Sequence, residues 1–169
     1  TIDIMGDTLR EIGQMLHNAP DVVAALKKSI EENAELRQQA DEYMKERIAM
    51  MCQKLLDTAR VNSHGVKVVA MTGVRIPDMV KNVAFGVRAA SPESTAFIGA
   101  TTDMAGKPLL TVMLTNDLVE EGMNASAMVR DAAKAIKGGG GGQPGFAQAG
   151  GKDGDGITQA FEALMAVFS

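Results

Sequence analysis

The spacing of apolar residues divides this chain into a helical first part and a mixed second part. In residues 8–16 apolar side chains recur three and four positions apart, and Pro20 follows, which predicts a short amphipathic helix. Residues 21–60 contain neither glycine nor proline, and their near three-and-four repeat predicts a second helix about 60 Å long, at roughly 1.5 Å per residue. Its apolar stripe is thin. The helix is therefore either a spacer that projects the following domain, or it buries the stripe on the N-terminal helix, on the following domain or on another chain.

After residues 62–65 the pattern changes to short apolar runs that alternate with amphipathic stretches. The predicted elements are, in order, a strand at 66–71, a helix at 77–88, two strands at 95–101 and 109–115 that form a hairpin, a helix at 125–136 and a last helix at 157–168. This order predicts the α/β fold class, with a long N-terminal helical stalk at residues 1–62. A small α/β globular domain with a central sheet and a Gly-rich loop follows at residues 65–169.

The most unusual stretch is a run of glycines near the end of the chain. Ten of the 18 glycines lie between Gly138 and Gly156. Because glycine loses more backbone entropy on folding than any other residue, such a run indicates positive-φ geometry or the close approach of another group. A flexible linker is the alternative. Residues 146–149 and the apolar helix after them instead favour an ordered loop with successive free N–H groups.

Two familiar nucleotide-binding loops do not fit this run. A Walker A loop needs Lys-Ser or Lys-Thr after its last glycine, whereas Lys152 is followed by Asp153. A dinucleotide fingerprint needs its glycines between the first strand and its helix, whereas these follow a helix. A more general phosphate-binding role is still possible for this segment. Lys134 and Lys137 lie just upstream, and glycine without a side chain lets a ribose-phosphate backbone approach.

Composition narrows the function classes. The net charge of −4 excludes a polycation that coats nucleic acid, although an acidic chain can still carry a local basic face. Cys52 is the single cysteine, which excludes an internal disulfide and a zinc site made of thiolates alone. His17 and His64 have no Cys, Asp or Glu at a spacing typical of metal ligands. We therefore expect no catalytic residue, no metal site and no cofactor in this chain.

The chain contains no targeting or membrane-spanning pattern. It has no run of about 18 apolar residues and no charged segment followed by an apolar one, so we expect no membrane contact and a cytoplasmic location. The first residue is Thr1 rather than methionine, which we interpret as the start of a fragment of a longer polypeptide.

A specific motif lies at residues 138–151, which read Gly-Gly-Gly-Gly-Gly-Gln-Pro-Gly-Phe-Ala-Gln-Ala-Gly-Gly. It closely resembles the C-terminal signature of alanyl-tRNA synthetases, in the domain named DHHA1 that they share with DHH-type phosphoesterases. Three upstream segments agree with the resemblance in order: Gly-Val-Lys-Val-Val-Ala at 65–70, Lys-Pro-Leu-Leu-Thr-Val at 107–112 and Asn-Ala-Ser at 124–126. The resemblance covers nearly the whole chain.

The resemblance implies a non-catalytic module that grips the outer corner of tRNA(Ala) and so supports aminoacylation and editing. It also implies that ATP, Mg and Zn belong to other parts of a parent alanine–tRNA ligase. The tRNA face that we expect is Gly138, Gly139, Gly140, Gly141, Gly142, Gln143, Pro144, Gln148, Gly150, Gly151, Lys152, Lys134 and Lys137. Gln143 departs from the family, in which many members carry Arg, and this weakens the phosphate contact expected there.

Two alternatives remain open at the level of the sequence. The first is a structural module that forms a homodimer through the long helix, whose apolar stripe needs a partner. The second is the substrate-binding half of a DHH-type phosphoesterase. In those enzymes a His follows the glycines, whereas this chain has Gln143 and Pro144 and contains no Asp-His-His triplet, which disfavours the second alternative.

Overall fold

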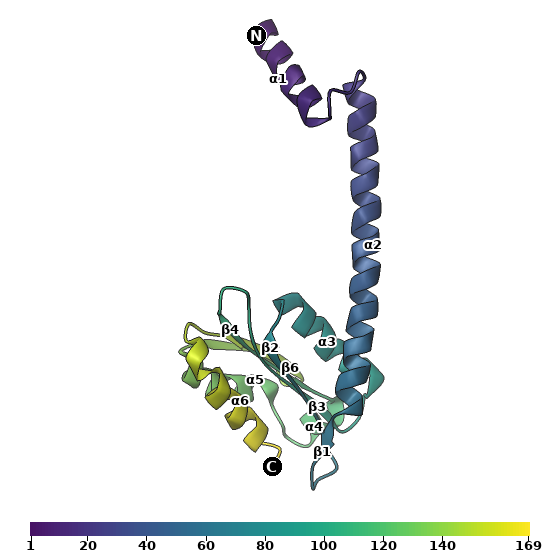
Figure 1. Cartoon of the computed structure of the whole chain (residues 1–169). Helices are drawn as coiled ribbons and strands as arrows, with labels where there is room; N and C mark the ends of the chain where they lie inside the picture. Colours follow the sequence, from purple (N-terminus) through teal and green to yellow (C-terminus); the bar gives the residue numbers. More distant parts are fainter. The chain divides into compact units, whose positions relative to one another are not determined.

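The computed structural model describes residues 1–169, which divide into two compact units, Thr1–Glu46 and Arg47–Ser169. The first unit holds α1 (Ile2–Met15) and most of α2 (Val22–Asp57) (Figure 1). It contains no buried residue. The last turns of α2 belong to the second unit. The domain boundary expected at residues 62–65 stays a prediction.

The second unit is built on a six-stranded sheet. The strands are β1 (Arg60–Val61), β2 (Lys67–Val74), β3 (Thr95–Thr102), β4 (Pro108–Leu114), β5 (Gly139–Gln143) and β6 (Phe146–Gly150). The helices are α3 (Pro77–Ala90), α4 (Asn116–Glu120), α5 (Ala125–Ala133) and α6 (Ile157–Ala166), with the short 3-10 turns η1 (Lys134–Ile136) and η2 (Gly154–Gly156).

The strand order places the glycine-rich segment at an edge of the sheet. The order is β1-β2-β3-β4-β6-β5, so β6 pairs with β4 and leaves β5 outermost. β2 and β3 are parallel and are joined by α3, whereas all other neighbours are antiparallel. In the centre of the sheet Ile98 lies opposite Val112, and Val112 lies opposite Ala147.

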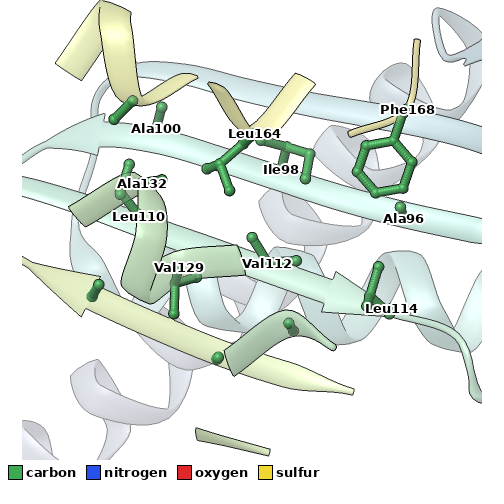
Figure 2. Close-up of a cluster of buried hydrophobic side chains, with 14 of the residues drawn as sticks. Ala96, Ile98, Ala100, Leu110, Val112, Leu114, Val129, Ala132, Leu164 and Phe168 are labelled. Atoms are coloured by element: carbon green, nitrogen blue, oxygen red, sulfur yellow. The ribbon is translucent and has the colours of Figure 1, made fainter. Parts of the chain in front are cut away.

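Helices α5 and α6 cover one face of the sheet. Side chains alternate between the two faces along a strand, so Ile98 of β3 and Val112 of β4 point to this side. There they pack on Val129 of α5 and Leu164 of α6, and all four are at most 1% exposed (Figure 2). Phe168 follows α6 and closes the same cluster (Figure 2). The final hairpin is therefore anchored on a packed layer of helices.

Helix α3 and the last turns of α2 cover the opposite face. Phe97 and Met113 alternate with the residues of the first cluster and are fully buried on this side. The Sγ atom of Cys52 in α2 donates to the carbonyl of Val83 in α3 at 3.5 Å, and burial raises the pKa of this thiol. A Cβ on Gly86 would lie 2.6 Å from that Sγ, so the glycine allows the close packing of the two helices.

The predicted α/β fold class is confirmed, including the hairpin of β3 and β4. The three predicted strands and the three predicted helices of the globular domain are present, with ends shifted by at most three residues. The expected Gly-rich loop is wrong, because that segment forms the hairpin of β5 and β6. None of the helices is both long enough and apolar enough to cross a lipid bilayer.

Candidate nucleic-acid interface

Gly138, Gly140 and Gly142 are explained by the close approach of β6. A Cβ on Gly138 would collide with the carbonyl oxygen of Gly150, and one on Gly140 with the carbonyl oxygen of Gln148. At Gly142 a Cβ would lie 2.5 Å from the carbonyl oxygen of Phe146. These two backbones leave no room for side chains between them. The group that approaches the glycines is the protein's own neighbouring strand.

The run forms a strand in place of the expected nest, and N–H groups at its open end are bonded within the chain. There the N–H of Gly138 donates to the carbonyl of Ala133 at 3.0 Å. The N–H groups of Lys152 and Asp153 both donate to the carbonyl of Ile136, also at 3.0 Å. These donors satisfy the last carbonyls of the α5–η1 segment, which have no partner inside the helix. These hydrogen bonds fix the hairpin to the helix layer, so the three N–H groups are not free to bind a ligand.

The outer edge of β5 presents a backbone without side chains. No strand pairs with this edge, and Gly139, Gly140 and Gly142 are exposed. A Cβ on Gly139 would meet nothing within 4 Å. An unpaired edge offers N–H and C=O groups to another molecule, and here no side chain keeps that molecule at a distance. This edge can therefore contact a bulky polymer backbone directly.

A hollow of about 420 Å³ lies between α3 and the glycine hairpin. Its lining comprises Lys81, Phe85, Arg88, Gly141, Gly142, Gln143, Phe146, Ala147 and Gln148. None of these residues is acidic. The hollow therefore combines two cations, two aromatic rings, two amide side chains and exposed backbone, the chemistry with which proteins bind single-stranded or looped RNA.

The aromatic and cationic groups of the hollow contact one another. The ring centroids of Phe85 and Phe146 are 4.7 Å apart, which joins α3 to β6. The guanidinium of Arg88 lies 4.9 Å from the centroid of the Phe85 ring, and Nζ of Lys81 lies 5.8 Å from it. Neither cation pairs with a carboxylate. Both charges thus stay available to a polyanion while the ring holds their positions.

The structure brings together only part of the tRNA face expected from the sequence. Gln143 and Gln148 line the hollow, and the amide nitrogen of Gln148 donates to the hydroxyl of Thr111 at 3.1 Å. Lys137 and Lys152 lie at the open end of the hairpin, whereas Gln143 lies beside its turn. The two ends of β5, Gly139 and Gln143, are four residues apart, which is roughly 13 Å at about 3.3 Å per residue. The two lysines are therefore separated from Gln143 by the length of the strand.

The remaining expected residues lie along the same hairpin or beside it. Lys134 is in η1, and its Nζ is 3.9 Å from a carboxylate oxygen of Asp131, with both side chains exposed. Pro144 forms the turn, where its carbonyl accepts from the N–H of Ala125 at 2.9 Å. Gly150 and Gly151 end β6 and leave it. Their roles toward RNA stay predictions.

The sequence analysis missed Lys81, Phe85 and Arg88. Their spacing of four and three residues places them on one face of α3, a signal that the sequence did contain. What it lacked was any sign that this face lies beside the glycine hairpin, about 60 residues further along the chain. No group of three or more His, Cys, Asp and Glu side chains is arranged to hold a metal ion.

The account of the glycines predicts unequal effects of two neighbouring substitutions. Gly140→Ala places a Cβ against the backbone of β6, so it must open the hairpin and lower the free energy of unfolding by about 2 kcal/mol or more. Gly139→Ala, whose Cβ enters open space, changes it by less than about 0.5 kcal/mol. Urea denaturation measures both. Equal losses of stability in the two variants would contradict the close approach of β5 and β6.

Relatives named alanine–tRNA ligase match almost the whole chain. The protein of Bacteroides thetaiotaomicron is 43% identical over 164 residues, which is 97% of this chain. That of Porphyromonas gingivalis is 36% identical over 159 residues, or 94% of this chain. The chain spans only about a fifth of the length of these relatives, 19% and 18% respectively.

Solved structures share the fold. The C-Ala domain from Aquifex aeolicus alanyl-tRNA synthetase superimposes with a TM-score of 0.55 at 23% identity, covering 65% of this chain and 96% of that domain. The DHH domain of a member of a family of ribosomal proteins gives a TM-score of 0.53 at 9% identity, covering 79% and 32% of the two chains. The family resemblance of the glycine motif is confirmed: residues 65–169 match the model of the DHHA1 domain, and the chain belongs to this family.

Proposed function

We propose that this chain is the C-terminal tRNA-binding module of an alanyl-tRNA synthetase. In this role it contacts the outer corner of tRNA(Ala) and supports aminoacylation and editing, without a catalytic group or cofactor of its own. The observation that carries the proposal is the hollow between α3 and the glycine hairpin, with its unpaired cations and its two phenylalanines in tilted contact. The relatives named alanine–tRNA ligase support the identity of the RNA.

Each part of the hollow has a distinct role in this proposal. Lys81 and Arg88 attract phosphates, which positions the RNA without reading its sequence. The Arg88 guanidinium already lies over the Phe85 ring, so an unstacked base can pack on the same aromatic and cationic surface. Gln143 supplies an amide side chain that donates and accepts hydrogen bonds. The bare edge of β5 lets the sugar-phosphate backbone approach.

The distribution of charge is compatible with RNA binding. Residues Thr1–Glu46 contain five basic and ten acidic side chains, a net charge of −5. Residues Arg47–Ser169 contain twelve basic and eleven acidic side chains, a net charge of +1. The negative total is therefore carried by the first unit. The second unit, which holds the hollow, is not electrostatically opposed to a polyanion.

The proposal extends to the longer protein and to its location. Because the relatives are about five times as long as this chain, ATP, Mg and Zn belong in the proposal to other domains of an alanine–tRNA ligase. A cytoplasmic location follows from the same role, since tRNA is aminoacylated in the cytoplasm. The phosphoesterase alternative is the weaker one: its support is the fold shared with the DHH domain, and this chain contains no Asp-His-His triplet.

A second candidate function is dimerisation through the first unit. Large apolar side chains are exposed along α1, among them Ile4 and Leu9, and along α2, among them Leu26 and Ile30. Unpaired amphipathic helices of this kind bury their apolar stripes in a second copy. We expect sedimentation velocity to show a dimer at micromolar concentration, and Leu9→Asp to shift it towards monomer. A monomer at all micromolar concentrations would remove this candidate.

Binding of folded tRNA tests the main proposal. We expect Lys81→Gln and Arg88→Gln each to weaken binding by about 3–10-fold and to reduce the salt slope by about one, because each removes one phosphate contact. Phe85→Leu removes the stacking surface and weakens binding by about 1 kcal/mol. Fluorescence titration with labelled tRNA at low salt measures these effects.

The control is Lys54→Gln, which removes an exposed positive charge that does not line the hollow. It should leave the affinity within about twofold of the original chain, since non-contacting surface charges act only at long range. Equal effects of all the charge variants, or no preference of the chain for folded tRNA over a polyanion such as heparin, would count against the proposed function.

A further inference from the structure

Ser126 carries a buried hydroxyl that has no hydrogen-bond partner. It lies in the first turn of α5, where the Asn124 side chain caps the helix by accepting from the N–H of Ala127 at 3.2 Å. Ser126 is 6% exposed, and its Oγ is the one buried side-chain oxygen or nitrogen of the chain without a partner. Buried polar groups are almost always paired, so an unpaired one calls for a ligand or another explanation.

Arg130 lies one turn further along α5 and is also unpaired. The spacing of four residues places it on the same face of the helix as Ser126. Its side chain is exposed, and the three ion pairs of the chain do not include it. The neighbouring carboxylate of Asp131 lies near Lys134 instead. The guanidinium therefore has its hydrogen-bond donors available.

Gly141 completes this arrangement from β5. A Cβ on Gly141 would lie 3.2 Å from Nη2 and 3.4 Å from Nε of Arg130, and 3.3 Å from Oγ of Ser126. The other glycines of the run, Gly138, Gly140 and Gly142, would instead collide with β6. Glycine at position 141 thus lets the Arg130 guanidinium and the Ser126 hydroxyl, both without partners, approach its backbone at the same point.

We propose that Ser126, Arg130 and Gly141 form an anion-binding site for a phosphate of the bound RNA. The inference rests on the proposed function and adds a second contact to it. The Arg130 guanidinium donates two hydrogen bonds to phosphate oxygens, and the Ser126 hydroxyl donates a third. The N-terminal end of α5 adds positive potential at the same place.

The site lies on the opposite side of the hairpin from Lys81 and Arg88. Helix α5 packs on one face of the sheet and α3 on the other. The glycine edge therefore has cations on both sides, and the RNA backbone crosses β5 with one phosphate held on each side. A side chain on β5 would obstruct this crossing. The glycines of β5 therefore serve RNA binding as well as packing on β6.

Titration with inorganic phosphate, followed by NMR of the 15N-labelled chain, tests the site without RNA. We expect saturable shifts of the Ser126 and Gly141 amides, which are lost in Arg130→Gln and reduced in Ser126→Ala and Gly141→Ala. Lys54→Gln is the control, since it removes an exposed charge outside the site, and it should bind inorganic phosphate as the original chain does. The spectra also report whether each variant is folded. Absent shifts in the original chain, or unchanged shifts in Arg130→Gln, would overturn the proposal.

Titration with folded tRNA separates RNA phosphate from free phosphate as the ligand. We expect Arg130→Gln to weaken tRNA binding by about 3–10-fold and to lower the salt slope by about one. If Arg88→Gln weakens binding and Arg130→Gln does not, the proposed function stands and this site is not an RNA contact. If both leave tRNA binding unchanged while inorganic phosphate still binds at Ser126, the RNA assignment of this site fails, and so does the role of the hollow.

Discussion

The organisation of the second unit depends on the close approach of the β5 and β6 backbones. At alternate positions of β5 the carbonyl oxygens of β6 occupy the space that a Cβ would need, as at Gly140 and Gly142. Only glycine fits at these two positions, and with Gly139 and Gly141 they leave Gln143 as the one side chain of β5. Hydrogen bonds from Gly138, Lys152 and Asp153 to the α5–η1 segment hold the hairpin in place. The exposed edge is thus rigid as well as bare.

This constraint determines which groups can surround a ligand at the edge. β5 contributes backbone, and the neighbouring helices contribute the functional side chains. On one side Lys81 and Arg88 of α3 lie beside the Phe85 ring, which contacts Phe146. On the other side Arg130 of α5 and the unpaired hydroxyl of Ser126 lie beside Gly141. In our proposals the hairpin lets RNA approach and the two helices bind its phosphates.

Much of the fold was predictable because apolar periodicity reports local structure. The short apolar runs around Ile98 and Val112 predict strands, the stretch from Pro77 predicts a helix, and the structure has all three. The glycine run was predicted as a loop because glycine has low strand propensity. The strand exists because tertiary packing on β6 overrides that preference. A run of glycines has no alternation of apolar and polar side chains, so the sequence carries no signal for a strand there.

The site was less predictable than the fold, for a different physical reason. The lysines near the glycines in sequence were the natural candidates, yet Lys137 and Lys152 lie at the open end of the hairpin. Lys81 and Arg88 reach the hairpin only through the packing of α3 on the sheet, a contact between distant parts of the chain. The unpaired state of Ser126 likewise depends on three-dimensional packing, which no local pattern encodes.

Hydrogen–deuterium exchange with and without folded tRNA tests the central claim most directly, because it reports the contacted surface across the whole chain. The account predicts slower exchange in peptides from β5 and β6, residues 138–150, and in peptides from α3, residues 77–90, when tRNA is bound. Protection confined to the first unit, residues 1–46, with unchanged exchange in the glycine hairpin, would contradict it.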